Sequence, residues 1–390
     1  MVLALSNEDK VFISEHLNSD VTKLVLKTIP DKRWLITQII SRKKAAKKLP
    51  NWYKNLDLLF PQPLSVEQSS SEITAKYKSE LTNGHTLIDT TGGMGIDSAY
   101  FAQQVDNLIY IEQNTELAQI TQFNFEVLGL NNTLVVNEDS ISFLKNYPKK
   151  ADWIYIDPAR RSAEQQRVSK FSDCEPDITK ILPLLFEKAT KILVKASSLL
   201  DIQQAFRELS NIKAIHVVAV ENDCKELLFE LDSQLENIDA VKIYAINLPN
   251  QTFTFNISDE QNAVIPFSNP LNYLYEPNSA VLKAGAFKSV AQQYGLFKIA
   301  PHSHLYTSEQ LVPDFCGRTF EILAITKVEA KALKPYLEDN KANITTRNFP
   351  MGVEELRKKL KLKDGGDVYL LATTFMNGDK RIIVCKKNQL

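Results

Sequence analysis

The 390-residue sequence has little cysteine, little glycine and no long apolar run. Its four cysteines lie at least 50 residues apart, which excludes a local zinc motif and predicts reduced, buried thiols. No segment reaches the roughly 18 apolar residues that a membrane-spanning helix requires. The N-terminus turns polar at Ser6–Lys10, too early for the apolar core of a secretory signal. These absences predict a cytoplasmic protein without a membrane segment.

An excess of charge of one sign is also missing, since 46 basic and 47 acidic residues leave a formal net charge of −1. The chain as a whole therefore lacks the electrostatic signature of a nucleic-acid-binding protein. Basic residues nevertheless cluster at residues 42–48 and 357–363. Each run is either a solvated helix face or part of a surface for a polyanion. In the second interpretation, Lys43 and Lys47 bind the substrate.

The length predicts two or three domains, and the pattern of apolar residues changes along the chain. Residues 1–65 repeat apolar side chains at helical spacing, which predicts an N-terminal helical region. Residues 66–236 alternate short β-rich runs with helical stretches, which indicates βαβ units. Residues 237–316 and 317–390 mix strands and helices less regularly, as α+β domains do. We therefore expect an α/β domain between a helical region and an α+β C-terminal region.

The alternating segments of residues 66–236 predict a parallel sheet with helices on both faces, a Rossmann-like fold. The expected strands are Thr86–Asp89, Leu108–Glu112, Thr133–Asn137, Trp153–Asp157, Lys191–Lys195 and Ile215–Val220. The expected helices are Ile96–Gln104, Leu117–Leu128, Ser140–Asn146, Ile178–Ala189 and Asp201–Ser210. In the C-terminal region we expect one helix over Ser279–Tyr294, and a hairpin of Val368–Thr373 and Arg381–Cys385 that turns at Asn377-Gly378.

A glycine-rich segment, residues 86–97, carries the clearest sign of chemistry. A strand runs into Gly92, Gly93 and Gly95 and then into a helix, so a ligand can approach backbone amides. Acidic residues follow the next three strands of the predicted sheet at positions 112, 139 and 157. The carboxyl ends of parallel strands share one edge of the sheet, so we expect these side chains to converge on one crevice.

The spacing of these acids suggests how each would hold a nucleoside cofactor. Glu112 can accept two hydrogen bonds from a ribose diol, and Asp139 can meet an adenine amino group. Asp89 ends the first strand, where a dinucleotide fold runs straight into glycine, and its carboxylate repels phosphate but attracts a cationic amino-acid group. This favours S-adenosylmethionine over NAD, with the remaining cofactor contacts from Asp89, Thr91, Gly92, Gly93 and Gly95. The alternative is a sheet whose strand ends are acidic only because they cap helices.

The segment Asp157-Pro158-Ala159-Arg160 resembles motif IV of class I S-adenosylmethionine-dependent methyltransferases, an Asp/Asn-Pro-Pro-aromatic tetrad. Here Ala159 replaces the second proline and Arg160 replaces the aromatic residue. The resemblance implies catalytic roles for Asp157, Pro158 and Arg160, and an Arg at this place is similar to the Asp-Pro-Pro-Arg form of several RNA methyltransferases. Arg160 and Arg161 either bind the substrate or form surface ion pairs. No cysteine follows the fifth strand, so uracil-C5 chemistry is not expected.

Further motifs extend the resemblance to nearly the whole chain. They are Lys44-Ala45, Lys48–Pro50, Glu67–Glu72, Cys224–Glu226, Tyr275–Asn278 and His302–Tyr306. With the glycine segment and the tetrad, they resemble bacterial and archaeal class I methyltransferases with a C-terminal THUMP-like domain. This resemblance implies a methyltransferase domain over 66–236, a ferredoxin-like module over 237–316 and a THUMP-like domain over 317–390. Related THUMP modules bind RNA, usually tRNA.

The sequence as a whole predicts S-adenosylmethionine-dependent methylation of RNA, either tRNA or rRNA. We expect Asp157 to orient the nucleophile or accept its proton, while catalysis is mostly positioning. A nucleobase ring nitrogen is the expected acceptor, because neither the aromatic clamp nor the cysteine is present. Two alternatives remain: a methyltransferase for a protein or small molecule, and a non-catalytic RNA-binding protein with a vestigial cofactor fold.

Several other residues have both a functional and a structural interpretation. Residues 68–72 either fold over the cofactor or form a helix capping box, and Asp97 either contacts the cofactor or stabilises a helix N-terminus. His302 and His304 have no further ligands at suitable spacing, so no metal site is expected. We expect Cys224 to be an inert thiol. The aromatic residues near the first basic run either stack on bases or form a helical core, and they are Trp34, Trp52 and Tyr53.

Overall fold

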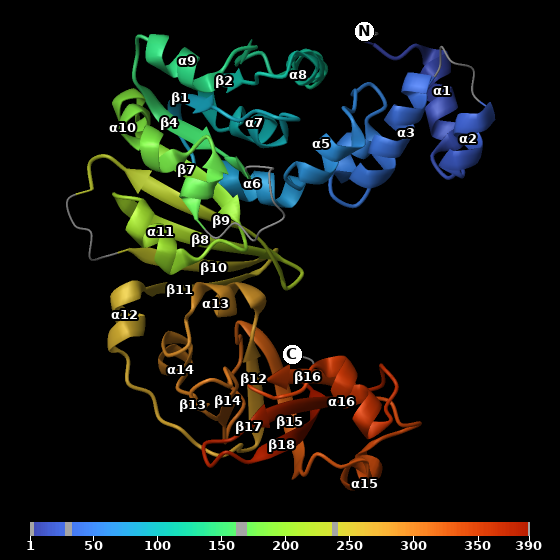
Figure 1. The fold of residues 1–390 in the computed structure, drawn as a ribbon, viewed down its shortest axis with the longest axis vertical. Coiled ribbons are helices and arrows are strands. Elements are labelled where there is room, and N and C mark those ends of the chain that lie inside the picture. Colours follow the sequence, from blue (N-terminus) through green and yellow to red (C-terminus); the bar gives the residue numbers. More distant parts are fainter. Residues whose placement is uncertain (1–3, 28–32, 161–169, 236–240, 389–390) are drawn as a thin grey trace. The chain divides into compact units, whose positions relative to one another are not determined.

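The structure is a computed structural model that describes residues 4–27, 33–160, 170–235 and 241–388. The chain divides into two compact units (Figure 1). The N-terminal unit comprises residues 1–214 and 226–238, and the C-terminal unit comprises residues 215–225 and 239–390. Within the described residues, no helix is long and apolar enough to span a membrane.

The N-terminal unit begins with short helices, as the sequence predicts. They are α1 (Asn7–His16), α2 (Val21–Lys27), α3 (Arg33–Ala45), α4 (Pro50–Lys54) and α5 (Pro63–Gln68). Proline opens α4 and α5, where its missing N–H costs no hydrogen bond. Leu35 and Ile39 of α3 lie in an apolar cluster with Ile120 of α8 (Thr115–Val127). Asn124 of the same helix exchanges two 2.8 Å hydrogen bonds with the backbone of Leu59, so the helical region is held to the α/β part of its unit.

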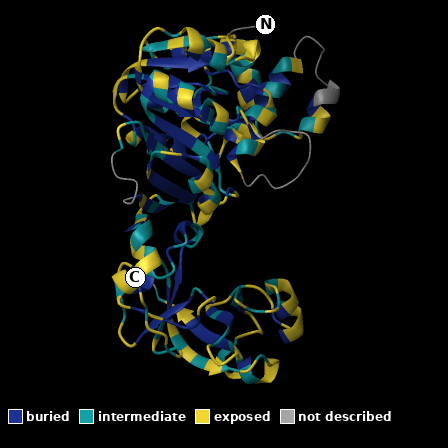
Figure 2. Cartoon of the chain, turned by 60° about the vertical axis from the view of Figure 1, so that its left-hand side comes forward, coloured by how far each residue is buried: buried dark blue, intermediate teal, exposed yellow. Residues whose placement is uncertain are grey.

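A mostly parallel sheet forms the centre of this unit, and Figure 2 shows its strands largely buried. The strands β7, β4, β1, β2 and β3 run parallel in that order, which confirms the predicted Rossmann-like arrangement. Their bounds are β1 (Gly84–Asp89), β2 (Val105–Ile111), β3 (Thr133–Val136), β4 (Ala151–Ile156) and β7 (Ala189–Ser197). The other helices are α6 (Glu72–Glu80), α7 (Ile96–Phe101), α9 (Ser140–Asn146), α10 (Ile178–Lys188) and α11 (Ile202–Glu208).

One strand of this sheet was not expected. β9 (Asp223–Asp232) runs antiparallel to β7, with Glu226 opposite Ser197. The chain turns into β9 through Glu221 and Asn222, which both have positive φ. A Glu-Asn pair is not the Asn-Gly or Asp-Gly pair that marks such turns in a sequence. A two-stranded ladder of β5 (Ala159–Arg160) and β6 (Cys174–Glu175) follows β4.

The C-terminal unit contains two groups of strands. β8 (Ile212–Val220) enters it at Ile215, and β10 (Lys242–Leu248) pairs antiparallel with β11 (Gln251–Asn256). A seven-stranded sheet has the order β13-β14-β12-β15-β18-β17-β16. Its strands are β12 (Tyr273–Pro277), β13 (Phe297–Lys298), β14 (Tyr306–Ser308), β15 (Gly317–Thr326), β16 (Asn343–Arg347), β17 (Val368–Thr374) and β18 (Lys380–Lys387). The helices are α12 (Ile257–Asn262), α13 (Ser279–Ala284), α14 (Ser289–Tyr294), α15 (Ala330–Leu333) and α16 (Val353–Leu360).

Two expectations for this region can be compared with the structure. The single helix over Ser279–Tyr294 is wrong, because α13 ends at Gly285, whose φ of +76° is left-handed, and α14 begins anew. The hairpin of β17 and β18 is confirmed, with Gly378 at a φ of +83° in its turn. Glycine adopts such backbone angles without the steric cost that other residues pay.

Candidate active site

The glycine segment forms a tight turn between β1 and α7. The amide of Gly92 donates to the carbonyl of Ile111 at 3.0 Å, and the amide of Gly93 donates to Oε2 of Glu112 at 2.8 Å. A Cβ atom on Gly92 would lie 2.2 Å from the ring of Tyr110, so only glycine fits there. Gly95 caps α7 with a φ of +78°. The segment is therefore bound to the end of β2, at the carboxyl edge of the sheet.

Asp89 lies beneath this turn and is almost fully buried. Its Oδ2 accepts a 2.5 Å hydrogen bond from the Ser98 hydroxyl, and its Oδ1 accepts a 3.0 Å hydrogen bond from the Thr91 amide. Burial raises the pKa of the Asp89 carboxyl to about 7, although these hydrogen bonds oppose the shift. Asp89 therefore changes its charge near neutral pH.

Glu112 and Asp139 follow β2 and β3, as expected, but they have different surroundings. Glu112 is half-buried, and its two oxygens accept the amides of Gly93 at 2.8 Å and Asn114 at 2.7 Å. A carboxylate has about four acceptor positions, so each oxygen of Glu112 can still accept a diol hydroxyl. Asp139 is exposed and caps α9 by accepting the Ser142 amide at 2.9 Å. The acceptor positions of Glu112 fit the hydroxyls of a nucleoside, whereas Asp139 accepts a hydrogen bond from its own helix.

Asp157 follows β4 and lies beside the glycine turn. Its amide donates to the Thr91 hydroxyl at 2.7 Å, and its Oδ2 accepts a hydrogen bond from Lys195 of β7. The Asp157 side chain is about one-third exposed and that of Lys195 is 14% exposed. Pro158 is half-buried, and the backbone of Arg160 pairs with Cys174 in the two-stranded ladder. Arg161 lies outside the described residues.

A buried cluster of charges next to Asp157 was not predicted from the sequence. Lys78 of α6 has no exposed side-chain surface, and its Nζ lies 3.0 and 3.1 Å from the two oxygens of Glu226 and 3.0 Å from Asp97. It also donates to the Ser70 hydroxyl at 2.7 Å. We call Lys78, Asp97, Asp157, Lys195 and Glu226 the lysine–carboxylate cluster. The one sequence signal that could have indicated this cluster is Lys78 itself, a lysine at a position of a short helix where the spacing of apolar residues predicts burial.

Asp97 belongs to this cluster in addition to lying in the first turn of α7. Its Oδ2 accepts hydrogen bonds from the hydroxyls of Ser70 and Tyr155, both at 2.8 Å. Burial alone would raise the pKa of the Asp97 carboxyl, but the charges of Lys78 and Lys195 and these hydrogen bonds lower it below its ordinary value. Asp97 is therefore ionised at neutral pH. Its place at the N-terminus of α7 does not by itself account for its burial beside two lysines.

Residues 67–72 connect the helical region to the cluster. Ser71 caps α6 through its side chain, and Ser70 reaches Lys78 and Asp97. Glu72 accepts the amides of Asn51 and Trp52 at 2.8 and 3.0 Å, at the start of α4. The segment therefore caps the following helix, as in the structural interpretation, but through Ser71 alone, because Glu72 caps α4 and completes no capping box. Lys48 lies nearby and donates to the carbonyls of residues 66 and 67.

The first basic run is only partly a surface. Arg42 is fully buried, and its guanidinium donates to the backbone carbonyls of residues 53, 55, 56 and 58. Lys43 and Lys47 are exposed, and Lys44 pairs with Glu67. Burial lowers the pKa of Lys48 to about 8, and the positive charge of Lys195 adds to this effect. Arg42 therefore stabilises the fold, and Lys43 and Lys47 are the exposed candidates for substrate binding.

The remaining candidates have structural surroundings. Trp52 lies in an apolar core and Trp34 packs against another, as in the core interpretation of these aromatic residues. His302 is exposed, while His304 stacks on Phe287 at 3.7 Å, and burial with nearby cations lowers the pKa of His304 to about 4. No group of three metal-binding side chains occurs in the part of the chain that the structure describes. Cys224 is half-buried and the other three cysteines are buried thiols.

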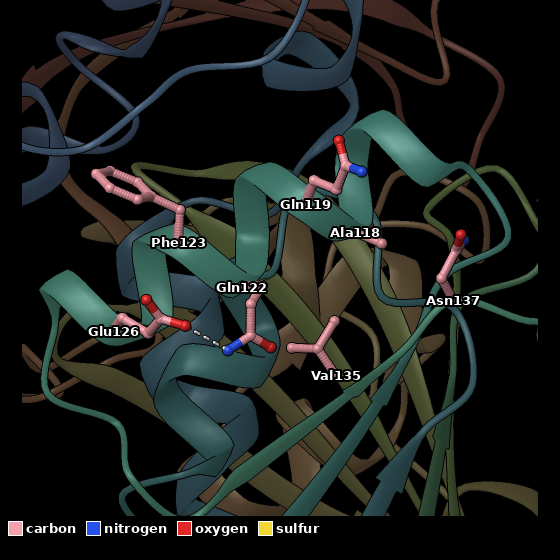
Figure 3. Close-up of a pocket in the computed structure, with 7 residues that line it drawn as sticks. All are labelled: Ala118, Gln119, Gln122, Phe123, Glu126, Val135 and Asn137. Atoms are coloured by element: carbon pink, nitrogen blue, oxygen red, sulfur yellow. Dashed lines mark hydrogen bonds between the residues drawn. The ribbon is translucent and has the colours of Figure 1, made fainter. Parts of the chain in front are cut away.

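A separate open pocket lies between α8 and the edge strand β3 (Figure 3). Its seven lining residues include none of the predicted cofactor residues. Asn137 at its rim donates to the backbone carbonyl of Glu112 at 2.8 Å, which supports the end of β2. The chemistry-bearing side chains instead gather around the glycine turn.

Comparisons with known proteins agree with this geometry. Residues 273–315 match the model of a ferredoxin-like domain and residues 317–387 match that of a THUMP-like domain. Strands β12 to β14 and β15 to β18 thus come from different domains yet form one sheet.

Relatives extend the likeness to the full chain. A crystal structure from Porphyromonas gingivalis W83, described as a methyltransferase, is 34% identical with a TM-score of 0.88 and covers 98% of each chain. An uncharacterized S-adenosylmethionine-dependent methyltransferase of Mycobacterium tuberculosis H37Rv is 20% identical over 345 residues, which are 87% of this chain and 92% of the relative. An uncharacterized RNA methyltransferase of Thermotoga maritima is 26% identical over 121 residues, 30% of this chain and 28% of that protein. The chain belongs to the class I S-adenosylmethionine-dependent methyltransferases that carry C-terminal ferredoxin-like and THUMP-like domains.

Proposed function

We propose that this methyltransferase acts on RNA. The observation that carries the proposal is the basic helix α16 in the THUMP-like domain. Its residues Lys358 and Lys359 are exposed, as are Lys361 and Lys363 directly after it. These side chains extend from one short segment, while buried Leu356 and Leu360 hold the helix to the domain core. Such a surface suits the phosphate backbone of a nucleic acid.

Two similarities support RNA in particular. Relatives from Thermotoga maritima and Mycoplasma mobile are named RNA methyltransferases, and the family resemblance implies a THUMP-like module of the kind that binds RNA. Exposed Lys43 and Lys47 of the helical region would bind the same substrate. Because these lysines are few, binding would depend on their joint action rather than on net charge.

We assign the cofactor site to the carboxyl edge of the sheet in the N-terminal unit. Glu112 would accept the ribose hydroxyls, Asp139 the adenine amino group, and Asp89 would face the cationic amino-acid group. The turn of Thr91, Gly92, Gly93 and Gly95 would line the remaining surface. When bound, S-adenosylmethionine supplies an electrophilic methyl group on a sulfonium. The residues of this chain have to bind and orient the two reactants and exclude water.

Asp157 would orient the nucleophile, as its place after β4 beside the glycine turn supports. Pro158 would shape the pocket, and Arg160 and Arg161 would contact RNA phosphate or base. For the acceptor atom the sequence predicts a nucleobase ring nitrogen, and this stays a prediction. It rests on the missing aromatic residue of the tetrad and the missing cysteine after the fifth strand.

The test is RNA binding and methylation by a charge variant with a matched control. In K358A/K359A we expect RNA affinity to fall and the slope of log affinity against log salt to decrease by about 1.5, since each phosphate contact contributes about 0.7–0.9. The control K149A/K150A removes the same charge from exposed lysines before β4, at the opposite edge of the sheet from the glycine turn. Equal salt slopes for the wild type and both variants would contradict the proposal. Label transfer to protein or small molecules, with none to RNA, would favour the alternative substrate class.

A further inference from the structure

The lysine–carboxylate cluster places a positive charge beside Asp157, at the proposed site of methyl transfer. The Nζ of Lys195 contacts Oδ2 of Asp157, at the carboxyl ends of β7 and β4. Glu226 enters from β9, where it lies opposite Ser197, and binds Lys78. Two cations and three carboxylates thus meet beside the glycine turn, drawn from α6, α7, β9 and the ends of β4 and β7.

The cluster keeps Lys195 charged. Burial alone would lower the pKa of Lys195, but Asp157, Glu226 and Asp97 raise it above the ordinary value. Lys195 is therefore protonated and does not act as a neutral base. The ammonium stays protonated and shares its acidic neighbours with Lys78, so one face of Asp157 is permanently occupied by a cation.

A fixed ammonium discriminates between classes of methyl acceptor. A neutral ring nitrogen gains positive charge when it attacks a methyl group, so it needs neither a proton acceptor nor a neighbouring ammonium. A hydroxyl oxygen has to lose its proton and gains negative charge on the way, which the same ammonium stabilises. A carboxylate that can take a proton, paired with an ammonium that can stabilise an oxygen charge, therefore suits an acceptor that gives up a proton.

The tetrad supports the same choice on independent grounds. Between Asp157 and Arg160 there is no aromatic ring, and Ala159 in the middle is exposed. Enzymes that act on a base hold the extruded base by stacking and by hydrogen bonds to its edge. A sugar hydroxyl lies on the backbone and needs no stacking partner within the tetrad.

The geometry points to a ribose hydroxyl of RNA as the methyl acceptor, bound beside the Asp157–Lys195 pair, in place of the nucleobase nitrogen that the sequence predicts. In this step an electron pair of the hydroxyl oxygen forms the new O–C bond, while the C–S bond breaks and its electron pair stays on sulfur. The hydroxyl proton passes to the Asp157 carboxylate, and Lys195 stabilises the developing oxygen charge. Glu226 and Lys78 act as positioning residues, because Lys78 pairs with Glu226 and Asp97, and the charges of these two carboxylates act on Lys195 rather than on the reactants. The inference rests on the proposed function, since it assumes an RNA substrate.

Product analysis tests the acceptor directly. The full-length protein would be incubated with methyl-labelled S-adenosylmethionine and with transfer and ribosomal RNA fractions from cells in which this gene is deleted. After digestion to nucleosides, mass spectrometry shows whether the label lies on the sugar or the base. Label on the sugar is expected. Label on the base overturns the inference but leaves the proposed function standing, whereas no label in either RNA fraction overturns both.

A variant of Lys195 tests its part in the step. We expect K195M to lower kcat by at least about 100-fold, while the Kd of S-adenosylmethionine and the KM for RNA change less than about threefold. K195R should recover part of the rate, because it keeps the charge. The control K191M alters a lysine on the same face of β7, one that lies over the Trp153 ring. Equal rates for K195M and K191M, or a loss of cofactor binding in K195M, would overturn the assigned role.

Discussion

Removal of Lys78 should destabilise the N-terminal unit strongly. The Lys78 ammonium is fully buried and is the counterion of both Glu226 and Asp97, at 3.0 to 3.1 Å. In K78M those two carboxylates stay buried without it. Breaking a buried ion pair from one side costs about 3–5 kcal/mol, because the remaining charge is desolvated and uncompensated.

A double variant separates the cost of stranded charge from that of lost packing. In K78M/E226Q only Asp97 loses its counterion, and it keeps hydrogen bonds from Ser70 and Tyr155. We therefore expect the double variant to be more stable than K78M alone by about 1–2 kcal/mol. The control K213M breaks a partly exposed pair with Glu230 and should cost less than about 1 kcal/mol.

Urea denaturation followed by tryptophan fluorescence measures these free energies of unfolding. All three tryptophans, Trp34, Trp52 and Trp153, belong to the N-terminal unit, so the signal reports that unit alone. If K78M cost no more than K213M, or if the double variant were less stable than K78M, the buried cluster would not hold the charges as described.

Three further predictions concern the cofactor site and the helical region. Because the pKa of Asp89 is about 7, the affinity for S-adenosylmethionine should rise between pH 6 and 7.5, as this carboxyl loses its proton and can attract the cationic amino group. Calorimetry measures this affinity, and in D89N it should not change with pH over the same range. G92A would place a Cβ 2.2 Å from a tyrosine ring and should weaken cofactor binding at least about tenfold, whereas G352A, with nothing within 4 Å, should bind normally. R42M should lower the free energy of unfolding by about 3 kcal/mol, because four buried backbone carbonyls lose their hydrogen-bond donor. Replacement of the exposed Lys43 by methionine should change this free energy little, and thermal unfolding compares the two variants.

The parallel sheet could be predicted from the sequence because its signals are local. Strands such as β4 are short apolar runs between helices with clear caps, and Asn114 and Asp139 cap α8 and α9 through their side chains. The same locality explains the errors. Gly285 ends α13 within a stretch whose apolar spacing continues into α14, and this spacing does not predict the left-handed φ of Gly285.

The candidate site was predictable only where its residues follow consecutive strands. Asp89, Glu112 and Asp157 end β1, β2 and β4, so the topology of a parallel sheet brings them together. Lys78 and Glu226 are 148 residues apart and meet only because β9 inserts antiparallel beside β7. Arg42 shows the opposite error, since a basic run in the sequence contains a residue that the fold buries.

The central claim is that the carboxyl edge of the sheet binds S-adenosylmethionine through Glu112. Calorimetric titration of S-adenosylmethionine into the wild type, E112A and E116A tests it most directly, because Glu116 is an exposed residue of α8 only four positions away. We predict micromolar binding to the wild type and E116A and at least a tenfold loss in E112A. Equal affinity of all three proteins would contradict the assigned site.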